Sequence, residues 1–280
     1  MADLTEQERK QLPHPFELSD HEIVIANVTI TTHKGPIVSA KDDEKWRQLL
    51  DGHCPEMVFA SNMLRISHQL ANGSTSTIEF NAYDALKLCE IDPDDPEQLA
   101  AIPTVSPKLL DAWKQRAAAR PDLQKIIIRH DWTYSTTYEA TLSGFDRAFE
   151  LTETDAFDVA LLTRHDPILM FDDIVLYEDE LHDSGDSRLT VKMRVMPTFY
   201  LVLCRFFLRL DGNLVKLREI RYFHLFGSDV VLKQVQEKSA TAKDAAARDK
   251  KGDSPCFFGS PDEVSQWCPI TSSTMYKCVL

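Results

Sequence analysis

The feature that most constrains this fold is the run from Pro167 to Phe226, where nearly every segment has the composition of a β-strand. Between Leu189 and Val195, odd positions are apolar and the positions between them are polar or cationic. An alternation of two predicts a strand with one face in a core and a cationic face outward. We expect "PILMFDDIVLY" to be its partner, joined through "HDSGDS". An antiparallel sheet should therefore dominate the fold.

Further hairpins and helices are predicted around this run. "YLVLCRFFLRL" and "LVKLREIRYF" should pair through a turn at Asp211-Gly212-Asn213, because Asp-Gly adopts the positive backbone angles of tight hairpins. "EIVIANVTITT" predicts one strand, and "MVFASNMLRISHQLANGSTSTIEFNAYDAL" predicts strand, turn, strand and helix. Helices are also expected over "DDEKWRQLLDG", "SPKLLDAWKQRAAARP" and "SPDEVSQW".

Together these elements predict a single α+β domain over residues 21–280, mainly antiparallel sheet with flanking helices. We expect residues 1–20 to form a flexible N-terminal arm. Two other segments are also expected to be flexible. They are the acidic, proline-rich stretch near 91–105 and the charged stretch near 237–255.

Charge and cysteine usage narrow the function classes. With 280 residues and a formal charge of −13, the chain is a poor candidate for coating nucleic acid, which needs a cationic surface. The most apolar run, residues 199–208, is interrupted by Arg205 and is too short to span a bilayer. Six scattered cysteines without CxxC spacing favour the reducing cytoplasm. We therefore expect a cytoplasmic protein without membrane or nucleic-acid partners, and no cofactor motif is present.

Charge is segregated between neighbouring predicted strands. Residues 172–187 contain seven acids and no Lys or Arg, whereas residues 188–222 contain eight bases and two acids. One interpretation is that opposite charges pair across strands, each pair contributing about 0.2–1 kcal/mol. The other is that some bases stay unpaired and receive an acidic peptide or a chain-terminal carboxylate.

A metal site is the alternative interpretation of the acidic half. Glu178, Glu180, His182 and Asp183 could supply ligands, but a strand would send 178, 180 and 182 to one face and 179 and 183 to the other. A metal-dependent hydrolase would use His130, Asp131, Glu180 and His182. No nucleophile elbow, P-loop or HExxH accompanies them, so the spacing offers no positive evidence for catalysis.

Four blocks resemble the TIPRL family, the regulators of TOR signalling that bind type-2A phosphatase catalytic subunits. They are "MVFASNMLRISH" with "IEFNAYDAL", "DWTYSTTYEATLSG", "VLYEDELHDSGDSRLTVKMRVMP" continuing to "FFLRLDG", and "SPDEVSQWCPI". With weaker flanks they span about residues 55 to 270. The resemblance implies a non-enzymatic protein whose groove receives the catalytic subunit and its acidic C-terminal tail.

The resemblance also implies partners and an effect. The partners would be type-2A, type-4 and type-6 like phosphatase catalytic subunits, together with the alpha-four type phosphatase chaperone. The phosphatase would be inhibited or held latent. Carried over to this chain, Asp84 of "FNAYDAL" takes a phosphatase-binding position, although an exposed helix acid is the alternative. Phe157 of "TETDAFDVALL" takes an apolar contact position, with core packing as the alternative.

Four further residues lie on one predicted strand, "LVKLREIRYFH". The resemblance places Leu217 and Glu219 on the strand that faces the partner, although the family often has a shorter acid at the second position. Arg218 and Arg221 are candidates for the tail carboxylate by charge type alone, because arginine grips carboxylates with two parallel hydrogen bonds. Trp132 of "DWTY" is better explained as a core residue.

Overall fold

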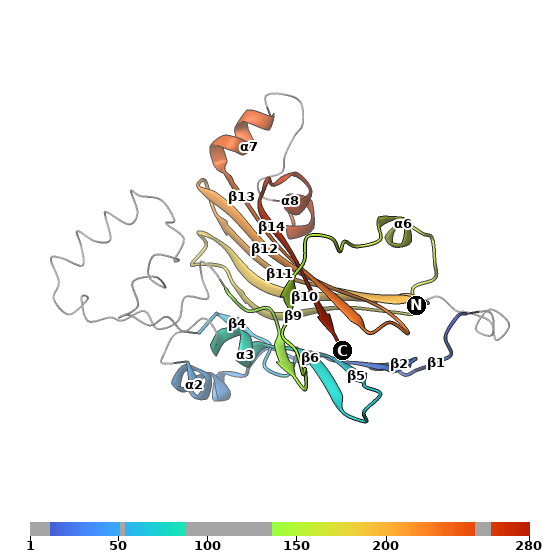
Figure 1. Cartoon of the computed structure of the whole chain (residues 1–280). Helices are drawn as coiled ribbons and strands as arrows, with labels where there is room; N and C mark the ends of the chain where they lie inside the picture. The colour runs from blue at the N-terminus through green and yellow to red at the C-terminus, as the bar shows by residue number, and fades with distance from the viewer. Residues whose placement is uncertain (1–11, 51–53, 88–135, 250–258) are drawn as a thin grey trace.

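The computed structural model describes residues 12–50, 54–87, 136–249 and 259–280. Two sheets in which every pairing is antiparallel form the fold, with the smaller sheet below the larger one in Figure 1. The six-stranded sheet has the order β1 (Phe16–Leu18), β2 (Glu22–Ile25), β3 (Val28–His33), β5 (Met63–Gln69), β6 (Thr75–Asn81), β7 (Thr141–Ser143). The prediction of an α+β fold dominated by antiparallel sheet is confirmed.

The larger sheet has eight strands, and six of them are ten to twelve residues long and lie side by side in the order of the chain. Its order is β4 (Met57–Val58), β9 (Met170–Asp179), β10 (Gly185–Val195), β11 (Phe199–Leu210), β12 (Leu214–Leu225), β13 (Val230–Thr241), β14 (Ile270–Val279), β8 (Glu150–Leu151). The described helices are short: α2 (Ala40–Leu49), α3 (Ala82–Lys87), α6 (Val159–Leu162), α7 (Ala242–Asp249) and α8 (Pro261–Trp267).

The main core lies between the two sheets. Ile66 and Phe80 of the smaller sheet belong to the same buried cluster as Val191 and Tyr222 of the larger one. The Phe80 and Tyr222 rings meet edge to face with centroids 6.0 Å apart. Because strand side chains alternate in direction, the opposite face of the larger sheet remains available for other contacts.

Both predicted hairpins of the central run are confirmed. Strand β9 pairs with β10, and β11 pairs with β12 around Gly212, whose φ is 71°. The expectation of one strand over residues 22–32 is wrong. Ala26 has a φ of 53°, and the chain turns there to form the β2–β3 hairpin.

The segments expected to be flexible fall partly outside the described residues. Within the predicted N-terminal arm, Phe16–Leu18 pairs with β2. Of residues 237–255, the first five complete β13 and the next eight form α7, because Lys238 is anchored to the Ser265 carbonyl and the strand stays paired. Residues 91–105, the helix expected from Ser106, and Trp132 lie outside the described residues.

Candidate functional site

The face of the larger sheet that points away from the core carries the candidate site. Along β12, Leu217 packs in a cluster with Val264 of α8, and Phe223 packs on Phe157 just before α6. Glu219, between them in the alternation, accepts a hydrogen bond from Ser265 of α8. We call this face the outer face; it lies uppermost in Figure 1, where α8 and α6 rest on it.

Bases gather on the outer face in the middle of the sheet. Strand register places Lys192, Leu203, Arg221 and Gln234 in one row across β10 to β13. The adjacent row pairs Arg205 with Glu219. We define the cationic strip as the five bases that four successive strands contribute here: Lys192, Arg194, Arg205, Arg221 and Lys238.

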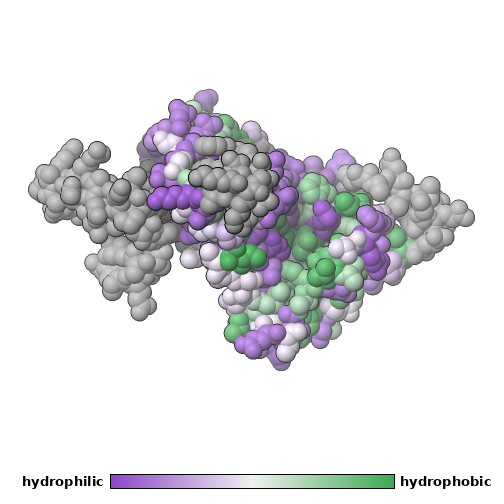
Figure 2. Space-filling view, turned by 90° about the horizontal axis from the view of Figure 1, so that it is seen from above, coloured by the Kyte–Doolittle hydropathy of each residue, from purple (hydrophilic) through white to green (hydrophobic). Residues whose placement is uncertain are grey.

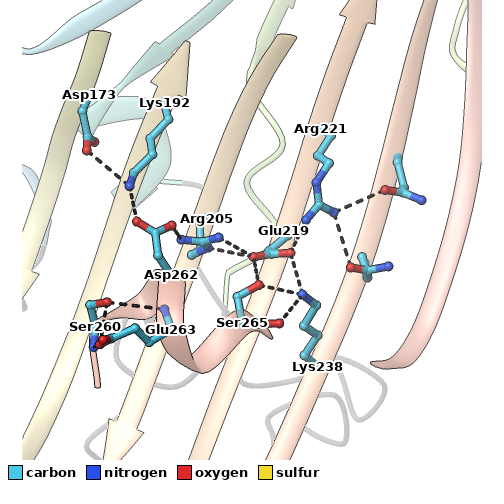
Figure 3. A network of polar contacts seen from close by, with 12 residues as sticks. Asp173, Lys192, Arg205, Glu219, Arg221, Lys238, Ser260, Asp262, Glu263 and Ser265 are labelled. Atoms are coloured by element: carbon cyan, nitrogen blue, oxygen red, sulfur yellow. Dashed lines mark hydrogen bonds and ion pairs between the residues drawn. The ribbon is translucent and has the colours of Figure 1, made fainter. Parts of the chain in front are cut away.

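A buried carboxylate holds the strip together (Figure 3). Glu219 is 0% exposed and lies 2.8 Å from Arg205, 2.5 Å from Arg221 and 3.1 Å from Lys238. Ser265 donates a further hydrogen bond of 2.7 Å. Burial raises the pKa of Glu219, but the neighbouring cations and the serine outweigh it and lower that pKa to about 2. Glu219 therefore stays charged and orients three bases.

A second carboxylate enters the strip from α8. Asp262 lies 2.5 Å from both Lys192 and Arg205, and Asp173 of β9 lies 3.4 Å from Lys192. Burial opposes ionisation of Asp262, but the hydrogen bonds from the two bases prevail and lower its pKa. Among the described residues, five bases thus face three acids, which is a local surplus of positive charge on a chain of charge −13. Arg194 is exposed and has no ion pair within the described residues.

An apolar surface adjoins this strip toward α6. Phe157 stacks on Phe223 with ring centroids 5.6 Å apart, and both belong to a cluster under α6. Val159 on α6 is 68% exposed, Phe171 on β9 is 52% exposed and Leu225 at the end of β12 is 39% exposed. Seen from above, hydrophilic side chains surround α7 and α8, and hydrophobic ones gather toward the α6 side (Figure 2).

The six predicted site residues do not form one cluster. Leu217 and Glu219 are fully buried beneath α8, so they offer no surface as the structure stands. Arg221 lies on the outer face, whereas Arg218 lies on the opposite face and pairs with Glu139 at 2.7 Å and with Glu237 at 2.5 Å. The two arginines therefore cannot grip the same carboxylate. Phe157 is half-buried and is shared between core packing and the apolar surface.

Asp84 lies in α3 on the smaller sheet, on the other side of the molecule from α8 (Figure 1). Its carboxylate accepts hydrogen bonds from the Thr141 hydroxyl at 2.6 Å and the Asn81 amide at 2.9 Å. The backbone N–H of Asp84 in turn donates to the Asn81 side chain. Asp84 is half-exposed and has no ion pair within the described part of the chain, so its charge is available to a partner.

The described residues of the alternative metal site give it no support. His130 and Asp131 lie outside the described residues, and the His182 side chain is 99% exposed. Leu181, His182 and Asp183 have positive φ, so the strand alternation expected through residue 183 is wrong beyond Asp179. Among the described residues, no three His, Cys, Asp or Glu side chains converge as metal ligands would.

Comparison with known proteins decides the family. The model of the TIP41-like family matches residues 57–245. The human TIP41-like protein is 32% identical over 268 residues, which cover 95% of this chain and 92% of that protein. The chain belongs to the TIP41-like family. The Arabidopsis thaliana TIP41-like protein is 35% identical over 89% of this chain and 87% of its own length. A Saccharomyces cerevisiae relative named type 2A phosphatase activator TIP41 is 34% identical over 81% of this chain and 65% of its own length.

The TIP41-like match includes α3 and strands β9 to β13 but stops before α8. The residues that sequence reasoning missed are Lys192, Arg194, Arg205 and Lys238 of the strip, and Asp262 of α8. The alternation in β10 places Lys192 and Arg194 on the same face, and this signal could have identified them. No described helix has the length and apolar character that a membrane span requires.

Proposed function

We propose that this protein binds the catalytic subunit of a type-2A family Ser/Thr phosphatase on its outer face and regulates it without catalysing a reaction. The observation that carries the proposal is the cationic strip, a surplus of positive charge on a strongly acidic chain, directly beside exposed apolar side chains. Protein interfaces combine an apolar centre with charged groups that set orientation. The name of the Saccharomyces cerevisiae relative supports a type 2A phosphatase as the partner.

The acidic C-terminal tail of the catalytic subunit is the ligand that suits the strip. Arg221 keeps part of its side chain exposed while Glu219 fixes its guanidinium, and Arg194 is exposed and unpaired among the described residues. Arginine recognises carboxylates through paired N–H donors, and a side chain that is already oriented loses less entropy on binding. Leu217 and Glu219 would then act from beneath, by positioning the strip.

The proposed mechanism is occlusion. Clasping the catalytic subunit and its tail would restrict holoenzyme assembly or substrate access and hold the enzyme latent. Catalytic subunits of the type-4 and type-6 classes would bind the same face. The alpha-four type chaperone would act on the same enzyme. The protein would work in the cytoplasm, in TOR signalling. Phosphatase assays on the reconstituted pair measure the effect. Because the Saccharomyces cerevisiae relative is named an activator, the first quantity to determine is whether phosphatase activity falls or rises.

The test is a binding titration with purified catalytic subunit, intact or lacking its last few residues. We expect the truncated subunit to bind at least about tenfold more weakly, as loss of a charge-assisted contact predicts. Arg194→Gln should weaken binding of the intact subunit and leave the truncated subunit unaffected. Arg218→Gln removes the same charge from the opposite face and serves as the matched control. Equal binding of intact and truncated subunits would contradict the tail site.

A further inference from the structure

Asp262 has an arrangement that a purely structural residue does not need. Its side chain is 53% exposed, yet it lies 2.5 Å from both Lys192 and Arg205. The partly exposed carboxylate thus lies between Lys192 and Arg205 of the cationic strip (Figure 3), in the position that a ligand carboxylate would occupy. Without it, the one ion pair that Lys192 would keep with a described residue is that with Asp173 at 3.4 Å. Asp262 supplies from within the chain the same chemical group that an acidic ligand would bring.

The attachment of α8 does not depend on this carboxylate. Val264 is fully buried in a cluster with Phe207 and Leu217. Ser265 bonds to Glu219 and to Lys238, at 2.7 and 2.6 Å. Val264 and Ser265 lie two and three residues after Asp262, within one turn of the helix, and both contact the sheet. Removing the Asp262 charge should therefore leave the helix in place.

The helix also has its own start signal. The Ser260 hydroxyl and the Glu263 carboxylate form a capping box, in which Glu263 accepts a 2.7 Å hydrogen bond from the Ser260 N–H. Such a box satisfies two of the free N–H groups at a helix start, here those of Ser260 and Glu263. Asp262 takes no part in this box. Its two carboxylate oxygens instead accept hydrogen bonds from Lys192 and Arg205 of the strip.

We propose that Asp262 is an internal competitor, a carboxylate that α8 places on the cationic strip and that an acidic ligand must displace. This inference rests on the proposed function, because it names the regulation of the same site. The competition lowers the affinity for weakly acidic ligands, so only a ligand with several acidic groups or a terminal carboxylate gains enough to displace it. Asp262 is thus a specificity-determining residue.

Direct binding measurements on the full chain test this inference. The probe is a synthetic acidic peptide with a free C-terminal carboxylate, and the same peptide with an amidated end is the comparison. Asp262→Asn should bind the free-carboxylate peptide about threefold to tenfold more tightly than the parent, the gain expected from removing one partly exposed competing charge. Glu17→Gln, which removes an equal charge from exposed β1, should leave the affinity unchanged.

A double variant locates the gain. In Asp262→Asn with Lys192→Gln, the base released by the first change is removed by the second, so the affinity should return to about the parent value. Equal or weaker binding by Asp262→Asn would overturn the inference, as would a gain that survives in the double variant. Thermal unfolding of each variant shows that it is folded before its affinity is compared.

The outcomes separate this inference from the proposed function. If the parent binds the phosphatase catalytic subunit through its tail and Asp262→Asn binds no more tightly, only the internal competitor is wrong. If neither the parent nor Asp262→Asn binds the peptide or the catalytic subunit, both proposals fail. If Asp262→Asn binds the peptide and the parent does not, the competitor is supported in its strongest form.

Discussion

At the scale of single residues, Glu219 stabilises the fold as a buried group that is charged at neutral pH. Its pKa is lowered to about 2, below an unfolded value of 4.5, so the stabilisation is present above pH 4.5 and is lost as the pH falls toward 2. Glu219→Gln should therefore lower the free energy of unfolding by about 3 kcal/mol at pH 7. Denaturant unfolding at pH 7 and at pH 3 checks this, because the gap between parent and variant should narrow at the lower pH.

Asp84 gives a second prediction at this scale. Asp84 lies on the other side of the molecule from the outer face, so its use by a partner requires that the bound catalytic subunit also extends to α3. On that proposal, charge reversal by Asp84→Lys should weaken binding of the catalytic subunit, since the half-exposed carboxylate has no base paired with it in the described residues. Asp84→Asn keeps an oxygen to accept the Thr141 hydroxyl and separates the charge from the hydrogen bond. For both variants, the free energy of unfolding should stay within about 1 kcal/mol of the parent value, as is usual for surface changes. Parent-like binding by Asp84→Lys would show that the contact is absent.

At the residue scale, the sequence predicted the cross-strand ion pairs but not the burial of Glu219. The cross-strand pairs Lys192–Asp173 and Arg188–Glu178 follow from acids and bases on neighbouring strands. The burial of Glu219 could not be predicted, because an acid in a strand is ordinarily assigned to solvent. That position is buried because α8 packs over it, with Ser265, 46 residues further along the chain, bonded to Glu219.

At the scale of elements, α8 is held on the sheet by its apolar side. Val264 is fully buried, so Val264→Ala should cost about 2 kcal/mol and raise amide hydrogen exchange across Pro261–Trp267. Gln266→Ala, on the exposed side of the same helix, is the matched control and should stay within about 0.5 kcal/mol of the parent. Unchanged exchange in Val264→Ala would mean that polar contacts alone hold α8.

Local sequence patterns predicted most of the individual strands, turns and helices that they were used to identify. Alternation predicted β10, Asp-Gly predicted the β11–β12 turn, and the Ser-Pro-acid signature predicted the start of α8 at Ser260. The division into two sheets and the position of α8 over Leu217 were not predicted. They depend on contacts between segments far apart in the sequence, for which a local pattern carries no signal.

At the scale of the whole molecule, two opposing fields act on an acidic ligand. The net charge of −13 repels it over long distances, whereas the cationic strip attracts it at contact. Salt screens exposed charges beyond about 8 Å at physiological ionic strength and affects close, partly buried pairs much less. The net charge therefore slows association of an acidic ligand, whereas the strip stabilises the ligand once it is bound.

The opposing charges predict that salt changes the association rate and the dissociation rate of an acidic peptide differently. Raising the salt concentration from about 20 to 150 mM should speed association of the acidic peptide, because screening weakens the long-range repulsion. Dissociation should accelerate only modestly, since contact pairs are less screened. Stopped-flow fluorescence with labelled peptide measures both rates. Arg194→Gln should raise the dissociation rate at every salt concentration without removing the salt dependence of association. A parent association rate that falls steadily with salt would mean that the strip, and not the net charge, governs the approach.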